Sequence, residues 1–180
     1  MQWSQLKVRI ESLFADSVRG RVELRTTRYR KAYDGMGRGW ITLDKKQIIN
    51  MCDYAFESKK WQEAQALRRA SGCVDYLNPE QQRGYYAAWD EAPKMLHAQA
   101  VFARWDMTSA LFEYLSTPME EILTSPNPII RGIGMLDRRV GKSRIATLAM
   151  GGEHVLVRRL HAFRCQAEGW HEAGDAHGRG

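Results

Sequence analysis

The fold class is decided between residues 21 and 43, which read RVELRTTRYRKAYDGMGRGWITL. Apolar and polar side chains alternate from Arg21 to Arg30, and this period of two is typical of a strand with one buried face. Gly39–Leu43 has the same character. The intervening Asp34-Gly35-Met36-Gly37 favours a turn, because glycine accepts a positive φ. The segment therefore predicts an antiparallel hairpin with a long loop.

The chain on either side of this hairpin is expected to be mostly helical. A first helix is predicted near the N-terminus with Ser4 as its cap, and helical periodicity continues from about Glu57. Between them, Gln47–Met51 favours a third strand, although a helix could begin there instead. A sheet of two or three strands needs helical cover to be stable. The sequence thus predicts an α+β fold, with a small N-terminal antiparallel sheet packed against a mostly helical body.

Three helix starts share one pattern, in which a capping residue precedes a proline. They are Asn78-Pro79, Thr117-Pro118 and Asn127-Pro128. Proline is tolerated at the first helical position because its missing N–H would have no helical partner there. A long apolar helix is expected between the first two starts, and Pro93 could open it.

We expect one α+β domain over residues 1–168, with the first helix and the sheet in 1–55 and the helical part in 56–168. The glycine-rich segment 169–180 is expected to be a flexible tail.

Length and cysteine usage limit the cellular setting. The chain has no apolar run near the ~20 residues that a membrane helix requires, and its start has no secretory signal. Its three cysteines are odd in number and widely spaced, which argues against a disulfide framework. These features predict a cytoplasmic protein without a membrane partner.

The charge is unevenly distributed along the chain. Lys plus Arg is 27 and Asp plus Glu is 21, a net charge of +6. The counts are nine basic against four acidic residues in 1–40, nine against twelve in 41–125, and nine against five in 126–180. Both ends are therefore basic, which favours an acidic partner such as nucleic acid or an acidic protein.

The first basic feature is the predicted strand that contains Arg25, Arg28 and Arg30. A cationic strand with an aromatic residue, here Tyr29, could lie on a nucleic-acid backbone and stack a base. The alternative is a solvated edge strand whose charges prevent unwanted strand pairing. The arginines fall on both faces, which argues against one clean binding face.

The second basic feature is a cluster of four cations around a predicted helix end: Arg138, Arg139, Lys142 and Arg144. Such a cluster could clamp a phosphate or a carboxylate. Asp137 precedes it and could pair with one of the arginines. The alternative is that these cations only favour the dipole of the helix C-terminus.

Other motifs give no enzyme class. Gly141-Lys142-Ser143 resembles the end of a phosphate-binding loop, but Leu136 occupies the position of the required glycine. His161, Cys165 and Glu168 lie on one helical face, yet zinc needs four ligands and no second pair is evident. We therefore expect no metal and no cofactor, and no catalytic residue is identified.

Five segments resemble a family of uncharacterised bacterial proteins. They are Trp3-Ser4-x-Leu6-Lys7, Arg19–Val22, Thr27–Arg30, Gly37–Ile41 and Leu136–Lys142. The resemblance covers most of the chain up to about residue 168. It implies a bacterial intracellular protein, and it implies no activity and no site residues.

The sequence therefore supports a hypothesis of a bacterial cytoplasmic binding protein, not an enzyme, whose basic surfaces meet nucleic acid or an acidic protein. One alternative is a protein-interaction module, such as a toxin-neutralising or defence-system component. Another is an enzyme that acts on an anionic substrate through the Arg138–Arg144 cluster. The main hypothesis requires that the two basic ends form one surface.

Overall fold

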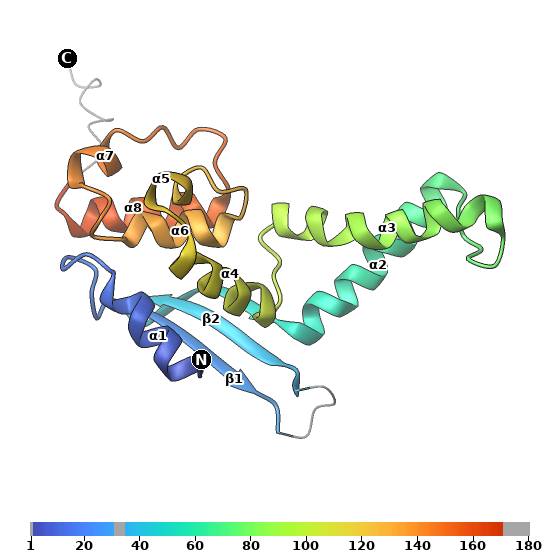
Figure 1. Ribbon diagram of the computed structural model, residues 1–180, viewed down its shortest axis with the longest axis horizontal. Helices are drawn as coiled ribbons and strands as arrows, with labels where there is room; N and C mark the ends of the chain where they lie inside the picture. The colour runs from blue at the N-terminus through green and yellow to red at the C-terminus, as the bar shows by residue number, and fades with distance from the viewer. Residues whose placement is uncertain (1, 31–34, 171–180) are drawn as a thin grey trace, which may run out of the picture. The chain divides into compact units, whose positions relative to one another are not determined.

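The computed structural model describes residues 2–30 and 35–170 (Figure 1). Helix α1 (Trp3–Ser12) precedes a three-stranded antiparallel sheet of order β1 (Val22–Arg28), β2 (Gly37–Leu43) and β3 (Lys46–Cys52). The elements that follow are α2 (Asp53–Ser71), α3 (Pro79–Ala98), α4 (Arg104–Ser116), α5 (Met119–Ile122), α6 (Pro128–Leu136), α7 (Lys142–Ala146) and α8 (Val155–Ala167). This architecture confirms the predicted α+β fold class.

The chain folds into two compact units whose segments interleave. Unit 1 comprises Met1–Leu24, Thr42–Lys46 and Ser109–Gly180, and unit 2 comprises Arg25–Ile41 and Gln47–Thr108. The single domain over residues 1–168 stays a prediction. Most of the predicted tail, residues 171–180, lies outside the described residues.

The predicted hairpin and the third strand are both present. β1 and β2 are paired at one end by the Tyr29 N–H, which donates to the Met36 carbonyl at 2.9 Å, and at the other by the Asp44 N–H, which donates to the Arg21 carbonyl at 2.8 Å. Asp44 and Lys45 connect β2 to β3 with φ of 46° and 67°. Two consecutive positive φ values are the geometry of the tight two-residue hairpin turn, whose twist matches that of the strands.

The core of unit 1 lies between α6 and α8, which run side by side (Figure 1). Gly132 in α6 makes this approach possible, because a Cβ there would lie 2.9 Å from the Leu160 side chain of α8. Both faces of the contact are apolar and buried, including Ile129, Ile133, Leu156 and Leu160.

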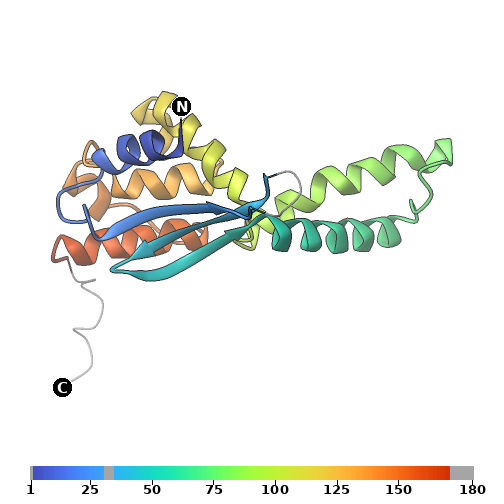
Figure 2. The same ribbon diagram turned by 90° about the horizontal axis from the view of Figure 1, so that it is seen from below.

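The core of unit 2 includes a hairpin of α2 and α3, which lie side by side in both views (Figures 1 and 2). The small buried residues Ala64, Ala88 and Ala92 allow the two helices to approach. α2 begins at Asp53, four residues earlier than predicted. The buried Asp53 carboxylate accepts hydrogen bonds from the Gly37 N–H and the Arg104 N–H, each at 2.7 Å, and this anchors the start of the helix.

Two of the three predicted asparagine and threonine caps are confirmed. The Asn78 side chain accepts from the Glu80 N–H at 3.0 Å, and the Asn127 side chain accepts from the Ile129 N–H at 2.9 Å. The prediction for Thr117 is wrong, because its hydroxyl donates back to the Glu113 carbonyl at 2.8 Å in the preceding helix. Ser4 is not a cap either, since α1 already begins at Trp3.

The prediction that Pro93 opens a helix is also wrong. Pro93 lies inside α3, a helix of 20 residues that starts at the cap Asn78. An internal proline removes one backbone hydrogen bond, which the packing of this long helix against α2 outweighs. The next helix starts instead at Arg104, where the Asp106 carboxylate accepts from the Ala103 N–H at 2.7 Å.

Candidate functional site

One face of the sheet in unit 2 carries cations and aromatic rings in place of core side chains. In β2, Gly37, Gly39 and Ile41 are buried, whereas Arg38 and Trp40 between them are partly exposed. The two hydrogen bonds that fix the β1–β2 register place Arg25 opposite Trp40, and directly opposite residues share a face. We call this surface the open face and define it by Arg25, Tyr29, Arg38 and Trp40, together with Gln47 and Asn50, the two β3 residues whose side chains contact Arg38.

Arg38 is the centre of the open face. Its guanidinium lies over the Trp40 ring, 4.8 Å from the ring centroid. Its Nε donates to Asn50 Oδ1 at 2.6 Å, and its Nη2 donates to Gln47 Oε1. Both acceptors are neutral amide oxygens, and no carboxylate in the described part of the chain forms an ion pair with Arg38. The cation is therefore held in one place while its charge stays uncompensated.

A second ring extends the open face. Tyr29, which is 38% exposed, stacks on Tyr54 with ring centroids 5.9 Å apart and an interplanar angle of 27°. Burial raises the pKa of the Tyr29 hydroxyl, and its hydrogen bond with Cys52 raises it further. The phenol is thus neutral at physiological pH and does not repel an anion beside Arg38.

The structure separates the three arginines predicted on the first strand. Arg25 is exposed and lies on the open face. Arg28 is exposed at the end of β1, but it has the strand register of the buried Leu24 and therefore faces the other way. Arg30 is exposed beyond the strand. Of the three arginines predicted on this strand, only Arg25 therefore belongs to the open face. The second cation of the open face is Arg38, which comes from β2.

Sequence reasoning missed Arg38, Trp40, Gln47 and Asn50. The spacing of Arg38 and Trp40, two apart on either side of Gly39, was a signal that they share one strand face. Nothing comparable pointed to Gln47 and Asn50, because their contact with Arg38 depends on the pairing of β3 with β2.

The predicted cluster from Arg138 to Arg144 lies in unit 1 and is mostly structural. Asp137 is fully buried, and its carboxylate accepts from the Tyr114 hydroxyl at 2.6 Å and from Arg139 Nη2 at 2.7 Å. This confirms the expectation that Asp137 pairs with an arginine. Burial and the hydrogen bond to Asp137 both raise the pKa of Tyr114, so the phenol remains a hydrogen-bond donor. Arg139 therefore neutralises a carboxylate of its own unit.

Lys142 also neutralises a carboxylate of its own unit, that of Glu168. Glu168, whose side chain is 4% exposed, accepts from Lys142 Nζ at 2.8 Å, from Arg164 Nε at 2.8 Å and from the Ser17 hydroxyl at 2.7 Å. Arg138 and Arg144 are exposed and have no carboxylate partner within residues 2–30 and 35–170. Two of the four cations thus face internal acids, and the cluster does not form a four-cation clamp.

The ion pair between Lys142 and Glu168 can be tested by the pH dependence of stability in a variant that lacks Lys142. Burial alone would raise the pKa of Glu168, but hydrogen bonds from Lys142 and Ser17, with the charge of Arg164, hold it below its ordinary value. A carboxyl with a lowered folded-state pKa stabilises the fold above its unfolded pKa of about 4.3, and the contribution disappears as the pH falls. We expect Lys142→Ala to be less stable than the wild type at pH 7, by under about 1 kcal/mol because the lysine is largely exposed.

The expected difference between Lys142→Ala and the wild type vanishes when Glu168 is protonated in both proteins. Urea unfolding at neutral pH and near pH 2 measures it. Arg144→Ala is the matched control, since it removes an exposed cation without a described acidic partner. A loss of stability in Lys142→Ala that is the same at both pH values would contradict the assignment.

The predicted histidine and cysteine of α8 do lie together. Cys165 Sγ is 3.6 Å from His161 Nε2, which is itself 2.8 Å from the Ile145 carbonyl oxygen. Glu168, the third residue of the predicted face, is held in its ion pairs. Within the described ranges, no three His, Cys, Asp or Glu side chains gather as metal ligands. Over the same residues, no helix combines the length and the apolar character needed to cross a bilayer.

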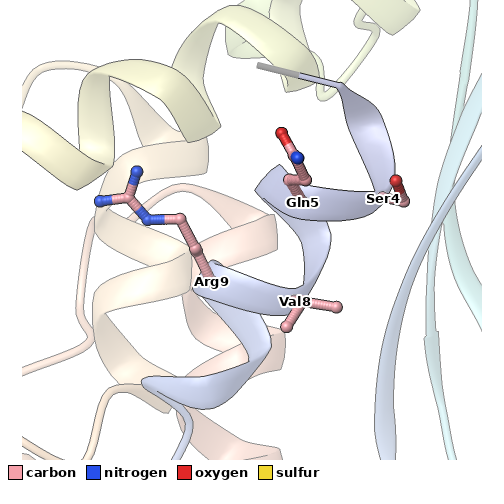
Figure 3. Close-up of a pocket in the computed structure, with 4 residues that line it drawn as sticks. All are labelled: Ser4, Gln5, Val8 and Arg9. Atoms are coloured by element: carbon pink, nitrogen blue, oxygen red, sulfur yellow. The ribbon is translucent and has the colours of Figure 1, made fainter.

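Unit 1 also has an open depression beside α1, with a volume of about 620 Å³. Figure 3 shows the four side chains that line it, Ser4, Gln5, Val8 and Arg9, all from α1. They supply one guanidinium and no carboxylate or imidazole. This lining offers no acid–base pair, and we do not assign a reaction to it.

Residues 2–165 match the profile of one protein family. The chain belongs to the SF0329 protein family. This match confirms the family resemblance seen in the sequence. The SF0329 segment includes the open face, Asp137 and the Arg138–Arg144 cluster. No curated protein and no solved structure matches the chain.

Proposed function

We propose that the protein binds single-stranded nucleic acid across the open face, without chemical conversion of the ligand. The observation that carries this proposal is the position of Arg38, which two neutral amides hold over Trp40. A planar cation with no described carboxylate partner is suited to phosphate, and guanidinium and aromatic planes both stack on bases. Arg25 adds a second exposed cation on the same face.

The geometry favours a single strand over a duplex. Stacking on a flat protein surface requires bases whose planes are exposed, and in a duplex they are covered by their neighbours. An acidic protein would satisfy the arginines but would leave the rings of Tyr29 and Trp40 without a matching partner. We place this activity in the bacterial cytoplasm, which the family resemblance and the three free cysteines favour.

The test is fluorescence anisotropy of labelled single-stranded and double-stranded oligonucleotides over a salt series. We expect tighter binding to the single strand, and an affinity that falls steeply as salt rises because binding releases condensed counterions. Arg38→Ala and Trp40→Leu should each weaken binding by about tenfold or more, the effect of losing one stacked base or a charged contact. Arg38→Lys keeps the charge but loses the plane, and we expect it to fall between Arg38→Ala and the wild type.

The matched control is Arg144→Ala, which removes one exposed cation from the other unit. We expect its binding to equal that of the wild type, and circular dichroism checks that every variant is folded. If no oligonucleotide binds at low salt, the proposed function is wrong. If Arg144→Ala weakens binding as much as Arg38→Ala does, the site is wrong.

A further inference from the structure

The loop that joins α2 to α3 exposes apolar side chains to solvent. Val74 is 58% exposed, Tyr76 is 50% exposed and Leu77 is 73% exposed, and Tyr86 in the following helix is 53% exposed. Tyrosine ring contacts connect two of them. The ring centroid of Tyr76 lies 5.7 Å from that of Tyr85, and the Tyr85 centroid lies 5.6 Å from that of Tyr86. We call Val74, Tyr76, Leu77 and Tyr86 the tip patch. It lies entirely in unit 2 and shares no residue with the open face.

The backbone of this loop is fixed by side chains. Gln81 Oε1 accepts from the Val74 N–H and the Asp75 N–H, each at 3.0 Å, and Asp75 Oδ1 accepts from the Leu77 N–H at 2.9 Å. The left-handed Gly72, with φ of 70°, ends α2 just before the loop. The apolar side chains are therefore exposed by an ordered loop, which lowers the entropy lost when they bind a partner.

The packing beneath the tip patch supports it. Arg68, which is 6% exposed, lies with its guanidinium 3.5 Å from the centroid of the Tyr85 ring and donates to the Tyr85 carbonyl at 3.2 Å. Cys73 packs so closely on Gly84 that a Cβ there would lie 2.4 Å from its sulfur. A rigid, exposed and aromatic surface of this kind is typical of a protein interface.

The charges beside the tip patch indicate which partner it fits. The exposed charged residues nearest in sequence are two cations, Arg69 and Arg83, and two anions, Asp75 and Glu80. A nucleic acid or an anionic membrane would select for cations alone. A surface with both signs is compatible with pairing to its own copy about a two-fold axis, because a cation of one copy can then meet an anion of the other.

We propose that two copies of this chain associate through the tip patch about a two-fold axis. Half-exposed tyrosine, leucine and valine side chains each offer roughly 100 Å², so each copy buries about 400 Å². Stable interfaces bury about 800 Å² per partner, and the dimer is therefore weak and reversible.

The test is sedimentation velocity of the full chain from about 5 µM to about 500 µM, the range in which so small an interface dissociates. We expect the mean sedimentation coefficient to rise with concentration, and Leu77→Glu and Tyr86→Glu each to weaken the association at least tenfold. Both positions are exposed, so the variants should fold, and circular dichroism checks this. The matched control is Val8→Glu, which adds the same charge at an apolar position of α1 that is 65% exposed.

Three outcomes would overturn the proposal. The first is a wild-type chain that stays monomeric over the whole range. The second is an association that Leu77→Glu and Tyr86→Glu leave unchanged, or that Val8→Glu weakens equally. The third is a wild-type chain that does not self-associate but binds neutral phosphatidylcholine vesicles in a manner that Leu77→Glu abolishes, since the tip patch would then be a membrane contact.

Discussion

Replacing Asp137 with alanine is expected to lower the free energy of unfolding by about 2–4 kcal/mol, because several hydrogen bonds to a buried carboxylate are lost and a buried donor is left unsatisfied. The Asp137 carboxylate is fully buried and receives the Tyr114 hydroxyl, the Arg139 guanidinium and the Arg139 N–H. Without it, the Tyr114 hydroxyl loses its acceptor in a place that water does not reach, and Arg139 loses its counter-charge. Unsatisfied buried donors cost more than the hydrogen bonds that they formerly made.

Urea unfolding followed by circular dichroism measures the loss. Asp16→Ala is the matched control, because Asp16 pairs with Arg19 but its side chain is 91% exposed. We expect that control to stay within about 0.5 kcal/mol of the wild type, as exposed ion pairs do. A loss below about 1 kcal/mol for Asp137→Ala would show that the Asp137 contacts do not hold this unit together.

The second large effect is expected for Gly37→Ala, at about 3 kcal/mol. A Cβ at position 37 would lie 2.1 Å from the Thr27 carbonyl oxygen and 3.0 Å from the Arg28 Cα. Both are backbone atoms of the paired strand, so they cannot move without separating β1 from β2. The Gly37 N–H also donates to the buried Asp53 carboxylate at 2.7 Å, and this hydrogen bond prevents β2 from shifting away from β1.

Thermal and urea unfolding of Gly37→Ala measure this effect. Gly141→Ala is the matched control, since Gly141 has a φ of −59° and a Cβ there meets nothing within 4 Å. We expect Gly141→Ala to lower stability by less than about 1 kcal/mol, because alanine caps the short helix α7 less well than glycine does. Equal stability of Gly37→Ala and the wild type would mean that β1 and β2 are less closely paired than the structure describes.

The predictions from sequence succeeded where the signal was local. Strand alternation in Arg21–Arg30 and the side-chain caps Asn78 and Asn127 depend only on neighbouring residues, and the structure has all three. Pro93 misled because its local preference for a helix start was outweighed by packing between α2 and α3. Thr117 misled because its hydroxyl had a second acceptor, the Glu113 carbonyl, in the preceding helix.

The candidate site was harder to predict, because its partners are distant in sequence. Arg25 and Tyr29 could be proposed from one strand, but Arg38 acquires its fixed position from Gln47 and Asn50 on another. Asp137 and Arg139 are two residues apart, and their pairing was foreseeable. The ion pair between Lys142 and Glu168 joins residues 26 positions apart, and no periodicity links them. Composition counts cations, but it does not say which of them are already neutralised.

The interleaved chain path has a consequence for experiments that cut the molecule. Unit 1 is assembled from three separate stretches of sequence, and the chain passes from one unit to the other within β1, between Ile41 and Thr42 in β2, near the start of β3 and within α4. No single truncation can therefore isolate either unit, and a protease that nicks one connection leaves three others intact. Fragments designed at a conventional boundary, such as residue 55, would divide unit 1, so the protein has to be expressed and studied whole.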